Sequence, residues 1–239
     1  LGAKRSLNTM SIEADRLRMA DAHGGLIYRG DLDKVWILDT GDHTYRELTP
    51  DSMQKMRARM AGAMARMQQQ LQSMPPEQRK RIEAMMAQRG GPTAGGQPPK
   101  ISYEKAGGSK TVGQWSCTPY KMMVNGTARS EMCIARLSDV GLTRDDIKAF
   151  VSLGTFMRQG MAGGPGGGRP PAGVYDFDSM SKAIGFDGIP VETSSVSPDG
   201  TVEFENKLKS VEHTAIPAAT FELPAGYTKQ EMPMMGGPG

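Results

Sequence analysis

Residues 115–136 read WSCTPYKMMVNGTARSEMCIAR, and this stretch determines the expected fold. Two runs of ten residues, 114–123 and 127–136, lie on either side of an Asn-Gly pair, which is a strong signal for the turn of a β-hairpin. Each run holds one of the two cysteines of the chain, Cys117 and Cys133. We therefore expect an antiparallel hairpin whose turn is at Asn125-Gly126.

The length of the hairpin loop decides whether the two cysteines can be bonded. A three-residue loop, 124–126, pairs Met123 with Thr127. Cys117 then lies directly opposite Cys133, and a modest adjustment closes the pair to disulfide distance. A two-residue Asn-Gly loop shifts the pairing by one residue and places the thiols on opposite faces. We expect the disulfide, which indicates a periplasmic or extracellular location; the alternative is two small buried apolar side chains.

The composition fits one domain over residues 1–239 with an ordered body and flexible inserts. The chain has 30 Gly, 16 Pro and 19 Met, but only 6% aromatic residues. No apolar run approaches the roughly 20 residues of a membrane span. The chain begins LGAKRSLNTM, without a signal peptide; we expect that one has been removed, which leaves secretion open.

Short runs rich in β-branched and aromatic residues, separated by turn residues, predict a mainly β chain. The first fifty residues have the pattern of a β-meander, because Gly- and Asp-containing turns divide them at close spacing. We expect a further strand just before the cysteine hairpin and a second hairpin around the Pro-Asp-Gly of residues 198–200. The expected strands lie in residues 6–20, 25–30, 34–39, 44–48, 100–105, 188–197, 201–213 and 220–232.

A methionine-rich segment after Thr49 predicts an inserted helix. Thr49 suits the N-cap position and Pro50 the first helical position. Apolar residues then recur three or four residues apart, which places them on one helix face. This expected apolar face consists of Met53, Met56, Met60, Met64, Met67, Leu71 and Met74.

The same helix is expected to have a basic side. Residues 50–90 contain eight Lys and Arg against three Asp and Glu, although the whole chain has a formal charge of only +3. We expect no nucleic-acid partner, but a basic helix side can lie near anionic lipid headgroups. The expected basic face consists of Lys55, Arg57, Arg59 and Arg66.

Other segments complete the expected domain map. A second helix in residues 74–91 would make 49–91 an inserted helical hairpin. A third helix is expected in residues 142–161, where Thr143 and Asp146 resemble a capping box. The Gly/Pro-rich residues 160–173 have the composition of a flexible loop, and 233–239 that of a flexible tail.

Three stretches resemble a family of bacterial envelope proteins. They are DLDKVWILDTGDHTYRELT (31–49), YEKAGGSKTVGQWSCTPYKMMVNGTARSEMCIA (103–135) and IPAATFELPAGYTKQEMP (216–233). Together with the Met-rich insert, they resemble domain-of-unknown-function family 4412, which is similar in fold to the periplasmic lipoprotein carriers. The resemblance implies an α+β, mainly β fold: a strongly curved antiparallel sheet that forms an unclosed barrel, with helices on its concave side. The periodicity alone predicts only an antiparallel sheet with inserted helices.

No catalytic or metal-binding pattern is found in the sequence, so we expect no enzyme activity, cofactor or metal. The histidines (His23, His43 and His213) lack the spacing of metal ligands, and the aspartates at 31, 33, 39 and 42 suit turns better than a calcium loop. Methionine thioethers can bind Cu(I). The helical spacing of the methionines favours an adaptable apolar surface instead.

These features lead to three hypotheses about function. The first is a non-enzymatic envelope carrier for an apolar ligand, such as an acyl chain or a lipoprotein, with the Met-faced helix as its lid. The second is a structural subunit of a larger envelope or extracellular assembly, in which the Met face contacts a partner protein. The third is a copper-binding protein.

Overall fold

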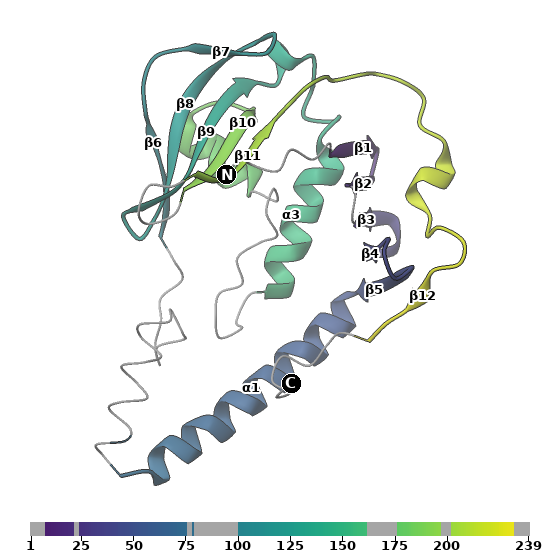
Figure 1. Ribbon diagram of the computed structural model, residues 1–239, viewed down its shortest axis with the longest axis vertical. Helices are drawn as coiled ribbons and strands as arrows, with labels where there is room; N and C mark the ends of the chain where they lie inside the picture. Colours follow the sequence, from purple (N-terminus) through teal and green to yellow (C-terminus); the bar gives the residue numbers. More distant parts are fainter. Residues whose placement is uncertain are drawn as a thin grey trace.

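The computed structural model describes residues 8–21, 24–75, 78, 100–161, 176–196 and 202–231. These residues form an α+β fold, mainly β, with helices beside two open sheets (Figure 1). The α+β prediction is therefore confirmed. The described strands pair into two sheets, however, where the resemblance implied one continuous curved sheet.

Sheet A is built mainly from the N-terminal meander. Its strand order is β1-β2-β3-β4-β5-β12; neighbours are antiparallel except β12, which runs parallel to β5. The expected strand at residues 6–20 is two strands, because the chain turns at Ala14 with a positive φ of 50°. The strands are β1 (Thr9–Glu13), β2 (Arg16–Ala20), β3 (Gly24–Arg29), β4 (Lys34–Asp39), β5 (Thr44–Leu48) and β12 (Thr228–Lys229).

Sheet B contains the cysteine hairpin at its centre. Its order is β11-β10-β9-β8-β6, and the short β7 pairs with the remaining part of β8. The strands are β6 (Ile101–Lys105), β7 (Lys110–Val112), β8 (Trp115–Val124), β9 (Thr127–Arg136), β10 (Gly188–Val196) and β11 (Val202–Lys207). The sequence reasoning did not anticipate β7.

The disulfide prediction is confirmed, but the pairing that supported it is wrong. The loop is the two-residue Asn125-Gly126 turn, with φ of 52° and 78°, and Val124 pairs with Thr127. A β-bulge then adds one residue to β9, since Met122 pairs with Ser130 while Met123 pairs with Ala128.

The bulge returns the two thiols to the same face of the sheet. Cys133 lies opposite Pro119, so Cys117 is its diagonal neighbour. The two Cα atoms are 5.4 Å apart, and the disulfide joins them. It lies in a buried cluster with Trp115 and Val191, on the opposite face from Tyr120 and Met132.

In the part of the chain that the structure describes, three α-helices lie beside the sheets. Helix α1 (Pro50–Ser73) follows β5 directly, as expected. Helix α3 (Lys148–Met161) begins later than expected, because residues 143–146 form a separate turn in which Thr143 Oγ1 donates to Asp146 Oδ2 at 2.7 Å. Helix α4 (Phe177–Ile184) was not expected. Single 3-10 turns are η1 (Gly30–Leu32), η2 (Ser138–Val140) and η3 (Ala218–Phe221).

Helices α3 and α4 cover different sheets. Leu153 and Met157 of α3 pack on Leu17 and Val35 of sheet A. Phe177 and Met180 of α4 pack on Tyr120, Met132 and Ile134 of sheet B, in a cluster that also contains Ile147 just before α3. The residue just before α3 therefore belongs to one apolar cluster, whereas the buried residues of α3 itself, from Ala149 to Met157, belong to the other.

The opposite face of sheet A is covered by the C-terminal segment, which runs across from sheet B (Figure 1). Leu223 and Tyr227 pack against Trp36 there. Glu47 accepts hydrogen bonds from Lys229 Nζ at 2.7 Å and Trp36 Nε1 at 3.0 Å. The hydrogen bond from Lys229, followed by that from Trp36, holds the pKa of Glu47 below its usual value.

Candidate functional site

The predicted N-terminus of α1 is confirmed in atomic detail. Thr49 is the N-cap, and its Oγ1 accepts from the Ser52 amide at 3.1 Å. The Thr49 amide in turn donates to Ser52 Oγ at 2.8 Å, which completes a reciprocal capping box. Two of the amide groups that a helix start leaves without partners are thereby satisfied.

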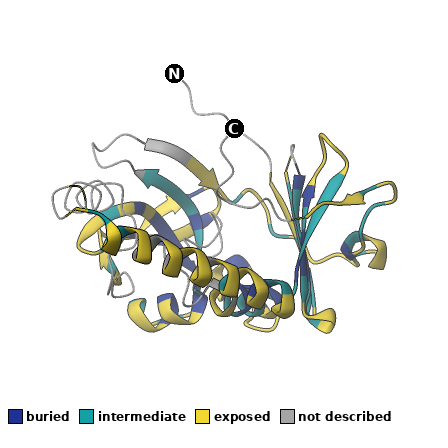
Figure 2. Cartoon of the chain, turned by 90° about the horizontal axis from the view of Figure 1, so that it is seen from below, coloured by how far each residue is buried: buried dark blue, intermediate teal, exposed yellow. Residues whose placement is uncertain are grey.

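Only the start of α1 is shown in the apolar core. Met53 is 5% exposed and packs with Leu48 and residues of α3. Beyond this point the helix extends away from both sheets (Figure 1), and most of its described residues are exposed (Figure 2). Met56 is 36% exposed, whereas Leu71 and Met74 are half-buried. The side chains of Met60, Met64 and Met67 lie outside the described set, so their packing stays a prediction.

The expected basic face is exposed with one exception. Lys55, Arg59 and Arg66 are exposed, and Lys55 forms an ion pair with Asp51 at 2.8 Å. Arg57 is half-buried instead, and its enclosed Nε has no hydrogen-bond partner. The reason is its position four residues after Met53, at the edge of the face that contacts the core.

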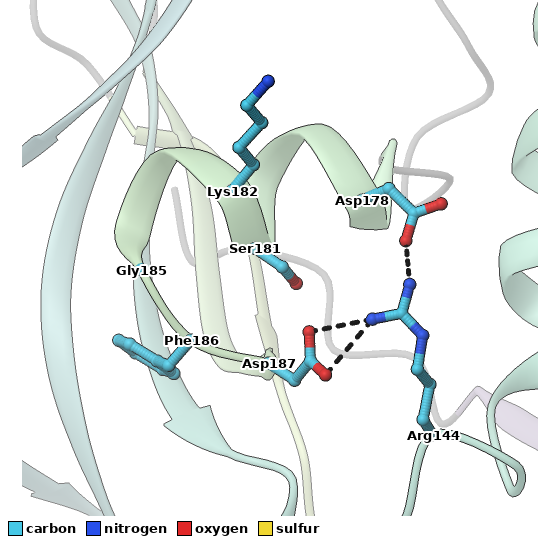
Figure 3. A pocket seen from close by; sticks show the side chains of 7 residues that line it. All are labelled: Arg144, Asp178, Ser181, Lys182, Gly185, Phe186 and Asp187. Atoms are coloured by element: carbon cyan, nitrogen blue, oxygen red, sulfur yellow. Dashed lines mark hydrogen bonds and ion pairs between the residues drawn. The ribbon is translucent and has the colours of Figure 1, made fainter.

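A second site, which the sequence reasoning missed, is a polar hollow of about 510 Å³ beside α4. Arg144 joins its two sides: Nη1 donates to both carboxylate oxygens of Asp187 at 3.0 and 3.1 Å, and Nη2 donates to Asp178 (Figure 3). We call these three residues the Arg144 clasp. Hydrogen bonding to Asp187, more than any other interaction, raises the pKa of Arg144.

The clasp is held in place by the ends of α4. Asp176 is the N-cap: it accepts from the Ser179 amide at 3.2 Å and pairs with Arg158 of α3. Burial alone would raise the pKa of Asp176, but the Ser179 and Arg158 bonds outweigh it and lower the pKa. Gly185 ends the helix in the left-handed region at φ 85°. Asp176 as a cap, Gly185 as a stop, and the apolar spacing from Phe177 to Ile184 are the sequence signals for α4.

Ser181 of α4 lines this hollow and has an unusual environment. The residue is 9% exposed, and its hydroxyl has no hydrogen-bond partner. Figure 3 shows the hydroxyl directed toward the Asp187 side of the clasp. Buried hydroxyl groups are ordinarily hydrogen-bonded, so an unpartnered one needs an explanation.

The other residues that the sequence offered as possible metal ligands take part in turns, hydrogen bonds or packing. Asp39 accepts from the Gly41 and Asp42 amides at 2.9 and 3.2 Å, which confirms its role in a turn. His213 Nε2 is hydrogen-bonded to the Gly141 carbonyl at 2.8 Å, and the His43 ring contacts Tyr227. Met132 is buried in the sheet B core with half-buried Met122 packed against that core, an arrangement that suits packing.

Several of the sequence predictions fall outside the described residues. They concern His23, the Gly/Pro-rich loop from residue 162 onward, the tail at 233–239 and nearly all of the second helix expected at 74–91. Within the described ranges, no helix has the length and apolar character needed to cross a membrane.

Searches of family models, curated proteins and solved structures find no match for this chain.

Proposed function

We propose that the chain is a non-enzymatic binding module of the bacterial envelope, and that it takes up an apolar ligand such as the acyl chain of a lipoprotein. The resemblance to envelope proteins suggests the class. The disulfide is compatible with an oxidising compartment. In this proposal the two open sheets are walls of an unclosed barrel, and α1 is a movable cover.

The observation that carries the proposal is the way α1 is attached. Met53 fixes the beginning of the helix in the core, while Met56, one turn later, is already 36% exposed. Burial of a methionine side chain contributes about 1.5–3 kcal/mol, so a face of several methionines gains much from an apolar contact. Gly62 near the middle costs roughly 1 kcal/mol against alanine, which weakens the helix at a point suited to bending.

Sheet A offers an apolar surface on the side that α3 covers. Met10, Met19, Leu26 and Ile37 pair in register across β1 to β4. Met10 is 44% exposed and the other three are partly buried. This row lies next to the mostly buried row that contains Leu17, so an acyl chain laid along it would extend the apolar core.

A second candidate function is a subunit of a larger assembly, and the hollows favour it. The hollow beside α4 is lined mainly by charged and hydroxyl side chains, and so is a smaller one of about 180 Å³. Neither suits an acyl chain, so a carrier has to move a helix before it can bind. A partner protein could cover α1 without any such movement.

Both candidates are tested by one pair of matched variants. Met60→Asp with Met64→Asp places two charges on the predicted Met face, whereas Ala58→Asp with Ala65→Asp places the same charges off that face by helical spacing. Each variant is purified from its source and examined by native mass spectrometry.

The carrier proposal expects a co-purified lipid on the wild type and on the Ala58/Ala65 variant, and a lipid-free folded monomer for the Met60/Met64 variant. If the wild type co-purifies with a protein complex and no lipid, and the Met60/Met64 variant loses that complex, the chain is a subunit of an assembly. Retention of lipid or complex by the Met60/Met64 variant refutes both, because the Met face is then not the binding surface.

A further inference from the structure

The polar hollow beside α4 is open to solvent and is bounded by the three ion-paired residues of the Arg144 clasp. Its volume of about 510 Å³ falls within the range of about 300–1,000 Å³ typical of small-molecule sites. Arg144 comes from the loop before α3, Asp178 from the first turn of α4 and Asp187 from the segment that enters β10. The clasp joins all three parts, so ligand groups would meet a preorganised surface.

The charges of the lining exclude strongly charged ligands. The carboxylates of Asp178 and Asp187 already share the guanidinium of Arg144. Lys182 stands exposed at the rim with its amino group directed away from the clasp (Figure 3). Two acidic and two basic residues give the lining no net charge. The carboxylates would repel an anion, and the guanidinium would repel a cation. A neutral ligand that both donates and accepts hydrogen bonds fits this lining best.

The unpartnered hydroxyl of Ser181 gives independent evidence for such a ligand. It lies at the inner side of the hollow beside Asp187 (Figure 3), where it has neither a donor nor an acceptor. Asp187 uses its two oxygens for Arg144 and keeps lone pairs free. A ligand hydroxyl near this point can donate to Asp187, and it can bond to Ser181 once the serine side chain turns its enclosed oxygen toward the hollow.

An adjoining hollow extends the polar surface past Phe186. This hollow of about 180 Å³ is lined by Ser109, Ser116 and Thr118 together with charged and apolar residues, and Phe186 lines both hollows. The hydroxyl groups of Ser109 and Ser116 are hydrogen-bonded to each other at 2.8 Å. The centroid of the Phe186 ring lies 4.7 Å from the guanidinium carbon of Arg136, which is a cation–π contact. Hydroxyl-bearing walls on both sides of one aromatic ring match a ligand with more than one hydroxyl-rich unit.

We propose that the hollow framed by the Arg144 clasp binds a neutral, hydroxyl-rich saccharide. The site is separate from α1, so it does not depend on the proposed carrier function. The probes are two neutral oligosaccharides, maltotriose and triacetylchitotriose. Glycylglycine and inorganic phosphate serve as zwitterionic and anionic competitors for the same surface.

Binding is measured on the full chain by amide chemical-shift titration, which also gives the location of the site. A saccharide should shift resonances at 178–188 and saturate. Ser181→Ala should weaken this binding about three- to tenfold, as expected for one lost hydrogen bond. The matched control is Ser130→Ala, because Ser130 is another buried serine with an unpartnered hydroxyl, on β9 and outside the lining.

Lys209→Gln gives a second variant that keeps the fold, since Lys209 is exposed and lies outside the lining of both hollows. It should leave neutral saccharide binding within about twofold. The proposal is overturned by the absence of saturable saccharide binding at millimolar concentration. It is equally overturned by equal binding to the Ser181 and Ser130 variants, or by tighter binding of glycylglycine or phosphate than of either saccharide.

Discussion

Removal of the Cys117–Cys133 bond tests both the hairpin register and the physical role of the disulfide. The change is the double variant Cys117→Ala with Cys133→Ala. Alanine is chosen over serine because the cysteines are only 3% and 1% exposed, and a serine hydroxyl would be buried in an apolar cluster. The bond closes a loop of 16 residues in sequence separation. Chain entropy for that loop corresponds to about 3 kcal/mol of lost stability.

Thermal unfolding followed by circular dichroism gives the measurement. In a chain of this size each kcal/mol shifts Tm by about 2–4 °C, so the variant should unfold about 6–12 °C earlier. Adding a reductant should lower the Tm of the wild type by a similar amount and leave the alanine variant unchanged. An equal effect of reductant on both proteins, or two free thiols in the denatured wild type under non-reducing conditions, refutes the reasoning.

Two further predictions concern the packing of α1 and the outer face of sheet A. Met53→Ala should lower the free energy of unfolding in urea by about 2–5 kcal/mol, because it leaves a cavity beneath α1. Met56→Ala, at an exposed position, should change it by no more than about 0.5 kcal/mol. Equal losses in the two variants would mean that Met53 is not the residue that attaches α1 to the core. The lowered pKa of Glu47, caused first by the Lys229 hydrogen bond, means that the unfolded state binds more protons near pH 4. Its stabilising effect is therefore complete above the unfolded pKa and is lost as the pH falls through the folded one. Glu47→Gln should flatten the loss of stability as the pH falls below the usual glutamate pKa of about 4.3.

Local patterns predicted much of the fold because each depends on neighbouring residues. The Asn125-Gly126 turn, the Thr49 cap and the β-meander follow from backbone preferences within a few residues. The same reasoning failed for the hairpin register, because the bulge near Arg129 is not encoded by the turn. Two differences of one residue, in loop length and at the bulge, add to a shift of two residues, which keeps both cysteines on the same face of the sheet and left the disulfide prediction correct.

Long-range features could not be predicted in this way. Strand β12 has two residues and pairs in parallel with β5, about 180 positions earlier in the chain. The Arg144 clasp joins residues 34 and 43 positions apart. Arg144 looked like part of a helix start in the sequence, and the local pattern gives no sign that it meets Asp187. Such contacts arise from packing of the sheets and helices, which periodicity alone does not specify.

The two proposed sites can be tested separately because of the way α3 is packed. Ile147, just before α3, lies in the apolar cluster with α4, while Leu153 lies in the cluster with sheet A and Met53 of α1. The hollow depends on the first cluster and the attachment of α1 on the second. Substitutions more than about 7–10 Å apart with no shared partners usually have additive effects. Charges introduced at residues 60 and 64 should therefore leave saccharide binding unchanged, and Ser181→Ala should leave lipid binding unchanged. Loss of both activities in either variant would mean that α3 shifts as a single element and that the two sites are coupled.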